Sequence, residues 1–245
     1  MQKLYEKSEI WFAVVWIVVY VVGTSVTDGL SAAIGVEKLI SLIFLAALCA
    51  VATVWMKKRG LLRKYGLCPP KAEGKRFLYY IPLLGIMSCN FWFGTAKNGS
   101  WVEIALYIAS MICVGFLEEV IFRGFLFQAM AKDSIKAAVI VSSVTFGIGH
   151  IVNLVNGSGA DLLPNLCQVC YAMAAGFLFV ILFYRGGSLW PCIVTHSVVN
   201  ALSAFASPEQ TNTMHIVSAL LLTIISLGYA LILCRTLPEK DPAQP

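Results

Sequence analysis

Six polar side chains lie inside apolar stretches of this sequence that are long enough to cross a membrane. They are Glu118, Glu119, Arg123, His150, His196 and Asn200. A charged side chain in hydrocarbon is costly unless it is paired or used, so intramembrane ionisable residues indicate a functional site. Glutamate and histidine can act as general bases, and histidine and asparagine can donate hydrogen bonds to a developing oxyanion. The residue types therefore point to hydrolytic chemistry.

The spacing within each stretch favours a common site. Glu119 and Arg123 are four residues apart with the acid first, so they can neutralise each other on one helix face. Glu118 lies about 100° further round the helix and lacks that partner, which makes it the better candidate for a base that exchanges protons. His150 and Asn200 lie on two other helices, and the alternative at this point is a structural ion-pair cluster that holds helices together.

The composition is that of an integral membrane protein. Of its 245 residues, 59% are hydrophobic and 13% are charged, and the mean hydropathy is +0.80. A helix needs about 20 apolar residues to cross the hydrocarbon core. We therefore predict an all-α, polytopic protein with about eight transmembrane helices, beginning near Ile10, Leu39, Phe77, Val102, Ala137, Leu166, Ser188 and Ile216.

The distribution of Lys and Arg predicts the orientation. If loops alternate between the two sides, 16 of the 18 basic residues fall on the side of the N-terminus, and only Lys38 and Lys97 fall on the other. By the positive-inside rule, both termini are expected in the cytoplasm. Helix lengths place Glu118 ~6 to 9 Å and His196 ~12 Å from that side, so we expect the site to open to the cytoplasm.

The chain divides at a basic segment. Residues 1–76 should form two N-terminal transmembrane helices followed by a basic cytoplasmic loop, and residues 77–245 should form a six-helix region with a catalytic core at 102–206. The first two helices carry no ionisable residue in their interior, which is typical of a scaffold or a lid. The net charge of +5 comes from loops beside helix ends, so nucleic acid is not an expected partner.

Three motifs contain the six residues: EExxxR from Glu118 to Arg123, FxxxH from Phe146 to His150, and HxxxN from His196 to Asn200. In this order they resemble the motifs of the CAAX-processing and bacteriocin-processing intramembrane endopeptidases, the CPBP or Abi family. The resemblance covers roughly residues 102–206 and departs at no motif position.

The resemblance implies a glutamate-type protease without a metal or other cofactor. Glu118 and His150 would hold and activate a water, and His196 and Asn200 would stabilise the oxyanion. Glu119 and Arg123 would support and neutralise the site. The substrate would be a membrane-anchored or lipid-modified chain, such as a prenylated CAAX protein or a peptide precursor, and the expected location is a bacterial plasma membrane.

Three alternatives remain from the sequence. Glu118, His150 and His196 are also ligand types for a catalytic zinc, although the helical HExxH pattern is absent. Glu and His relays occur in proton-coupled transporters, but the paired interrupted helices of many transporters are missing. A non-catalytic bacteriocin-immunity or membrane scaffold protein would keep the fold without the chemistry.

Overall fold

The computed structural model describes residues 1–70, 80–156 and 161–237, and this part of the chain is helical, with a single isolated bridge between Thr95 and Ala206. The all-α prediction is therefore confirmed for the described residues. The elements in chain order are α1 (Gln2–Lys7), α2 (Glu9–Ala33), α3 (Leu39–Lys58), α4 (Ile81–Met87), η2 (Cys89–Phe91), α5 (Trp101–Glu118), the π-helix η3 (Glu119–Phe127), α6 (Gln128–Met130), α7 (Ile135–Gly149), η4 (His150–Leu154), α8 (Leu162–Gly186), α9 (Trp190–Leu202), η5 (Ser203–Phe205) and α10 (Asn212–Thr236).

Six helices in the described residues are long and apolar enough to cross a membrane. They span Glu9–Ala33, Leu39–Lys58, Trp101–Met130, Ile135–Leu154, Leu162–Gly186 and Asn212–Thr236. Two of the eight expected spans are not among them. Phe77, where one was expected to begin, lies outside the described residues, and α4 after it has 7 residues. The other corresponds to α9, which has 13 residues.

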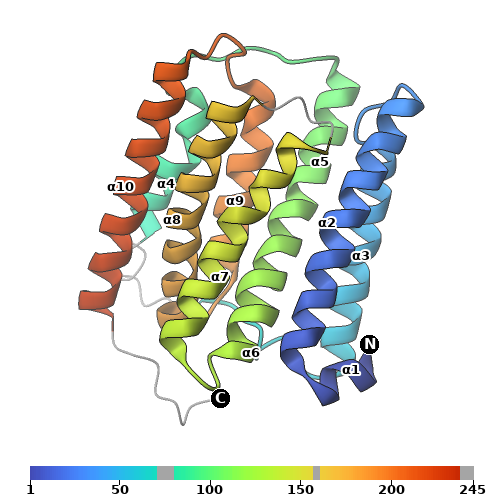
Figure 1. The fold of residues 1–245 in the computed structure, drawn as a ribbon, viewed down its shortest axis with the longest axis vertical. Coiled ribbons are helices and arrows are strands. Elements are labelled where there is room, and N and C mark those ends of the chain that lie inside the picture. Colours follow the sequence, from blue (N-terminus) through green and yellow to red (C-terminus); the bar gives the residue numbers. More distant parts are fainter. Residues whose placement is uncertain (71–79, 157–160, 238–245) are drawn as a thin grey trace.

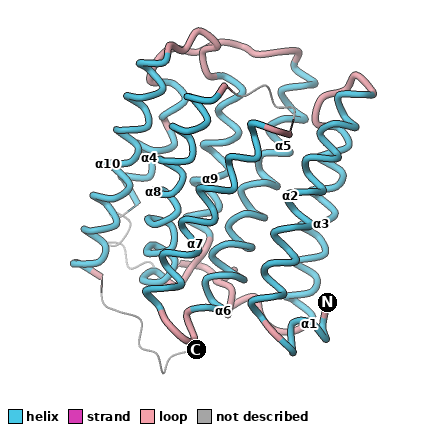
Figure 2. Tube along the Cα trace, viewed as in Figure 1, coloured by secondary structure: helices cyan, strands magenta, loops and turns pink. Residues whose placement is uncertain are grey.

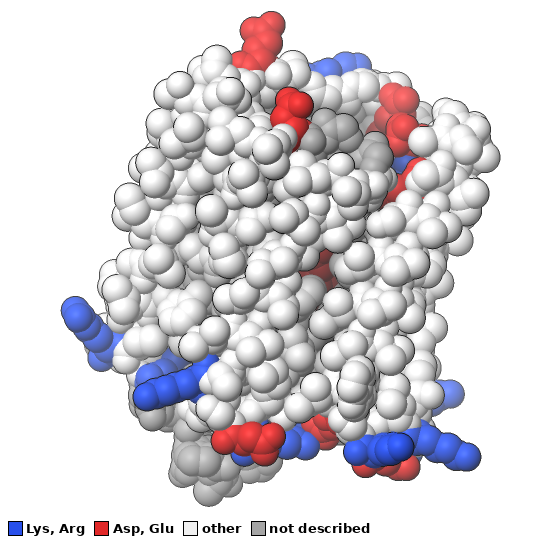
Figure 3. All heavy atoms as spheres, viewed as in Figure 1, with Lys and Arg blue, Asp and Glu red and all other residues white. Residues whose placement is uncertain are grey.

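The helices run roughly along one axis and form a bundle, with loops at its two ends (Figures 1 and 2). The N-terminus and the last turn of α10 lie at the same end (Figure 1). Lys and Arg gather at this end in Figure 3, and we call it the basic end. The α2–α3 turn lies at the opposite end. That the basic end faces the cytoplasm stays a prediction of the positive-inside rule.

The bundle is assembled around α5 and α8. Helix α8 packs against α7 and α10, while α5 packs against α9 and α3. The α5–α9 contact depends on Gly115, because a Cβ there would lie 2.8 Å from the Cα and 2.7 Å from the backbone nitrogen of Ser197. Helices approach this closely where a glycine replaces a side chain. Glu118 and His196 are one turn or less from this contact, so it brings them together.

Local sequence signals fix where these helices begin and end. A capping box starts α5, in which the Ser100 backbone N–H donates to Glu103 at 2.7 Å and the Glu103 backbone N–H donates to the Ser100 hydroxyl at 3.3 Å. Pro191 lies in the first turn of α9, where the fixed φ of proline suits a helix start. Gly187 ends α8 in the left-handed region, with φ of 74°.

Candidate active site

The backbone changes from an α-helix to a π-helix at the double glutamate. The π-helix η3 covers Glu119–Phe127, and all nine of its residues are buried. A π-helix has a wider turn than an α-helix and is frequent at functional sites. The sequence predicted a regular α-helix here, so the π-helix is a correction. At this junction the two consecutive carboxylates, Glu118 and Glu119, both lie near the His196 imidazole, at 3.4 and 2.9 Å.

Glu119 forms the centre of a buried charged cluster. Its Oε1 accepts hydrogen bonds from Arg123 Nη1 at 3.0 Å and from His196 Nδ1 at 2.9 Å. The side chains of Glu119 and Arg123 are both 0% exposed. The structure thus pairs the two residues that the sequence placed on one helix face, and it adds His196 to the pair. Glu119 therefore orients His196 as well as neutralising Arg123.

Arg123 is held between aromatic rings. Its guanidinium carbon lies 4.0 Å from the ring centroid of Phe146 and 5.5 Å from that of Phe179. A guanidinium stacked on aromatic faces gains cation–π stabilisation, which matters most where water is excluded. Its Nε and Nη2 find no hydrogen-bond acceptor among the described residues. Phe146 thus has a direct role in the site, since it also lies edge-on to the rings of both His150 and His196.

Glu118 faces open space instead. Its Oε1 accepts a hydrogen bond from the Tyr20 hydroxyl at 2.7 Å, and its Oε2 lies 3.4 Å from His196 Nε2. This Oε2 is buried and makes no hydrogen bond within the described part of the chain. A buried polar atom of this kind is normally satisfied by water. Glu118 is therefore the carboxylate that can hold a water for chemistry.

Tyr20 was missed by the sequence analysis, which assigned the first two helices to a scaffold or a lid. It belongs to α2, so the N-terminal helices contribute directly to the site. A tyrosine in an apolar helix carries no charge at neutral pH and gives no signal of its own. Asn165 was missed for the same reason. Its side-chain amide donates to the His150 carbonyl at 2.9 Å and fixes the turn that presents His150.

The hydrogen bonds of the two histidines determine which ring nitrogen is free. His150 Nδ1 lies 3.0 Å from the Phe146 carbonyl oxygen, and His196 Nδ1 faces the Glu119 carboxylate. Both partners only accept hydrogen bonds, so we infer that each Nδ1 carries a proton. His150 Nε2 is then available to accept a proton from water. His196 Nε2 becomes a donor when its ring is protonated.

A cavity unites the residues that the motifs singled out. Glu118, His150 and Asn200 line a cavity of about 700 Å³. A smaller one of about 70 Å³ is lined by His150, His196 and Asn200, and another of about 100 Å³ by Glu118 and His150. All four residues expected to be catalytic therefore line cavities, and these cavities share His150. Cavities of several hundred Å³ are typical of ligand sites.

The sequence predicted a site that opens at the basic end, but the cavity of about 700 Å³ extends towards the opposite end. Its lining reaches Asp28, Glu37 and Lys38, which belong to the end opposite the basic end. The sequence estimate ended the helix near Arg123, whereas the helix continues to Met130. Counted from Met130 at ~1.5 Å per residue, Glu118 lies ~18 Å from the basic end instead of ~6 to 9 Å.

Within the described residues, no group of three or more His, Cys, Asp and Glu side chains is arranged to hold a metal ion. Glu118, His150 and His196 were the ligands considered for zinc. Of these three, Glu118 and His196 approach each other, with Oε2 and Nε2 3.4 Å apart. Both the expectation of a metal-free mechanism and the zinc alternative stay predictions.

Comparison with known families agrees with the motif resemblance. The family model for type II CAAX prenyl endopeptidases of the Rce1-like kind matches residues 100–202. This part of the chain is similar to the Rce1-like family. The matched segment begins at Ser100, the N-cap of α5, and ends with Leu202, the last residue of α9. It contains all six candidate residues. No curated protein and no solved structure matches the chain.

Proposed function

We propose that the protein is an intramembrane endopeptidase that hydrolyses peptide bonds of membrane-associated polypeptides. The observation that carries this proposal is the cavity of about 700 Å³ in which Glu118, His150 and Asn200 meet beside His196. Similarity of residues 100–202 to a family of CAAX prenyl endopeptidases supports the reaction class. The six membrane-crossing helices support an integral membrane location.

The proposed reaction begins with a water held between Glu118 Oε2 and His150 Nε2. His150 Nε2 accepts a hydrogen bond from the water, and Glu118 takes a proton from it as the water oxygen attacks the peptide carbonyl carbon. His196 Nε2 and the Asn200 amide donate hydrogen bonds to the oxyanion that forms. The C–N bond then breaks, and the proton held by Glu118 passes to the leaving amine. No step needs a metal or another cofactor.

The remaining residues support this arrangement. Tyr20 donates to Glu118 Oε1 and so leaves Oε2 for the water. Glu119 holds the His196 ring at Nδ1, and Arg123 balances one of the two carboxylate charges. Because these groups are buried, their hydrogen bonds and charges act in a medium of low dielectric constant. The arrangement can stabilise negative charge on a substrate without moving.

The substrate class comes from the family. The matched family is described as acting on CAAX prenyl proteins, which are lipid-modified. We propose either such a chain or a peptide precursor anchored in the bilayer as the substrate. In both cases the lipid or hydrophobic segment would keep the scissile bond within reach of a buried site.

The test is cleavage of membrane-tethered peptides by purified protein in lipid vesicles, analysed by mass spectrometry. A library of anchored peptides should give discrete products with wild-type protein and none with Glu118→Gln. Binding without cleavage would indicate an immunity or scaffold protein. Proton movement across the vesicle membrane without products would indicate a transporter. Either result would contradict the proposed peptidase.

A further inference from the structure

In the described part of the chain, aromatic side chains fill the space between α2, α3 and η3 on the basic side of the site. Phe125 packs against Phe12, Trp16, Trp55 and Tyr65, with ring centroids 5.0 to 6.0 Å apart. These residues come from α2, α3, the loop after α3 and η3. All but Trp55 are buried. Interiors packed in this way leave no space for water.

Charged residues close the same end further out. Glu9 at the start of α2 pairs with Lys64 and with Lys132, each at 2.8 Å. Burial lowers the pKa of Lys64, but hydrogen bonds to Glu9 and Tyr5 and the charge of Glu9 outweigh that effect and raise it. Lys64 therefore stays charged, and the pairs tie α2 to the loop after α3 and to the α6–α7 turn.

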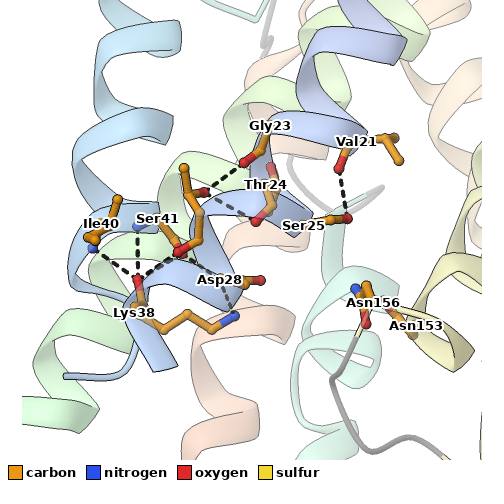
Figure 4. A network of polar contacts seen from close by, with 12 residues as sticks. Val21, Gly23, Thr24, Ser25, Asp28, Lys38, Ile40, Ser41, Asn153 and Asn156 are labelled. Carbon is orange, nitrogen blue, oxygen red and sulfur yellow. Dashed lines mark hydrogen bonds and ion pairs between the residues drawn. The ribbon is translucent and has the colours of Figure 1, made fainter. Parts of the chain in front are cut away.

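Beyond Glu118 in the other direction, the cavity stays open. The cavity of about 700 Å³ is lined there by Thr24, Asp28 and Lys38. Its lining ends at Glu37, an exposed residue of the α2–α3 turn. Figure 4 shows how this turn is held: the Ser41 hydroxyl and Lys38 Nζ both contact Asp28, the latter at 2.9 Å. The rim is thus a fixed structure, and it leads from solvent to the catalytic carboxylate.

A second opening lies on the side of the bundle between α2 and α7. The cavity of about 100 Å³ is lined there by Thr24 and Ser25 of α2 and by Asn153 and Asn156 after α7, and it reaches Glu118. Figure 4 shows the two asparagines across the gap from Ser25, and Figure 3 shows acidic atoms recessed in a hollow at mid-height on this face. Both walls of this opening therefore carry polar groups, with hydroxyls on α2 and amides after α7.

We propose that substrates reach Glu118 from the end of the bundle opposite the basic end, through the cavity rim and the α2–α7 opening. By the positive-inside rule, that end faces away from the cytoplasm. Among the proposed substrate classes, this selects extracytoplasmic segments of membrane-anchored peptides or proteins. It excludes lipid-modified C-termini on the cytoplasmic face. This inference rests on the proposed peptidase function for its substrate and on the positive-inside rule for the side of the membrane, but the end at which the cavity opens rests on the structure.

Cysteine labelling with a membrane-impermeant thiol reagent tests the direction. The seven cysteines that are not buried are first replaced, and buried Cys192 is kept. Single cysteines are then introduced as Thr24→Cys in the cavity, Ser134→Cys at the basic end and Glu209→Cys at the opposite end. Size-exclusion profiles and thermal unfolding in detergent confirm that each variant is folded.

In intact cells without an outer membrane, Thr24→Cys and Glu209→Cys should label and Ser134→Cys should not. In inverted vesicles, Ser134→Cys alone should label. If Thr24→Cys labels only together with Ser134→Cys, or from neither side, the proposed access is wrong. If Ser134→Cys labels from outside, the protein is inverted and the site opens to the cytoplasm. Glu118→Gln added to the Thr24→Cys variant should leave labelling unchanged, so this result is independent of catalysis.

A reporter links the direction to the reaction. One peptide that the purified protein cleaves is fused to a transmembrane helix in two orientations, so that it lies on either side of the membrane. Cleavage of the extracytoplasmic fusion alone is expected. Cleavage of the cytoplasmic fusion alone would overturn the inference while leaving the peptidase function intact. Cleavage of neither, with labelling as expected, would show that the opening admits the thiol reagent but not a tethered peptide, and would overturn the proposed substrate route. If the purified protein cleaves no peptide at all, the proposed function fails, while the labelling still tests the direction of access.

Discussion

Two adjacent glutamates have different environments. The Glu119 side chain is 0% exposed and bonded to two partners, whereas the Glu118 side chain is 14% exposed and faces a cavity. Chemistry at an enzyme site needs one group that is free to bind water and others that hold it in place. Glu118 is placed to bind the water and Glu119 to hold its neighbours. Substitutions at the two positions should therefore have different effects.

Glu118→Gln removes the proposed base while keeping the size and the hydrogen bond from Tyr20. We expect peptide cleavage to fall by ~10²-fold or more, because general base catalysis contributes about that factor. Thermal unfolding should be nearly unchanged. Tyr20→Phe should give a smaller loss, since it removes one hydrogen bond to Glu118 and not the base. Initial rates on an anchored peptide provide the measurement, and near wild-type activity of Glu118→Gln would disprove the assignment.

Glu119→Gln should act mainly on folding. It leaves the Arg123 guanidinium without its carboxylate in a fully buried position, and breaking a buried ion pair in this way costs about 3 to 5 kcal/mol. The expected result is a lower yield of folded protein and a lower unfolding temperature. Glu119→Asp, which keeps the charge, should recover part of both. A variant Glu119→Gln that is as stable as wild type would show that the cluster is not structural.

The sequence identified the six polar residues because charged and amide groups stand out against apolar helices. Their convergence could be expected, since three helices each carried a pair at the same spacing. Tyr20, Asn165 and Phe179 could not be identified, because each is an ordinary residue of a membrane helix whose role depends on what packs against it. The pairing of His196 with Glu119 required the distance between α5 and α9.

At the level of elements, the π-helix η3 was also hidden from the sequence. All nine of its residues are buried, so hydrophobic periodicity carries no information about its hydrogen-bond register. The short α9 was hidden too, because the apolar stretch that contains it continues into a 3-10 turn, η5. Helix starts were more predictable, since Pro191 is a local signal.

The α5–α9 contact can be tested through its glycine. Gly115→Ala places a methyl group 2.8 Å from the Ser197 Cα and should force the two helices apart. We expect lower thermal stability and a loss of cleavage of at least ~10-fold, because a displacement of about 1 Å in a catalytic group is costly. Gly228→Ala in α10 is the matched control. No atom lies within 4 Å of its added Cβ, so it should be neutral or slightly stabilising. Equal effects of the two changes would argue against the contact.

At the scale of the whole molecule, hydropathy gave the membrane location and the helical class. It could not give the direction of the cavity, because that depends on which end of the bundle is filled. Phe12, Trp16 and Phe125 fill it, and in the sequence they are ordinary apolar residues of membrane helices. Charge counting located the basic end correctly in the described part of the bundle, but a basic end need not be the open one.

Metal dependence is a property of the intact protein. A strong zinc chelator should leave cleavage unchanged, and purified protein should contain much less than one metal ion per chain by elemental analysis. The physical reason is that no three or more His, Cys, Asp and Glu side chains of the described residues are arranged to hold a metal ion. A ratio near one, with activity lost on chelation and restored by zinc, would replace the water-on-glutamate mechanism with a metal site.

The short α9 has a consequence for the surrounding lipid. At ~1.5 Å per residue, its 13 residues reach only ~20 Å, about 10 Å less than a typical hydrocarbon core. Trp190 and Val194 are exposed on its outer face, so lipid must adapt to it. Thinning of the leaflets beside α9 relieves such a mismatch, and it brings headgroups and water nearer to His196. Cleavage should therefore slow as acyl chains lengthen in synthetic vesicles, and a rate independent of chain length would show that the bilayer does not deform there.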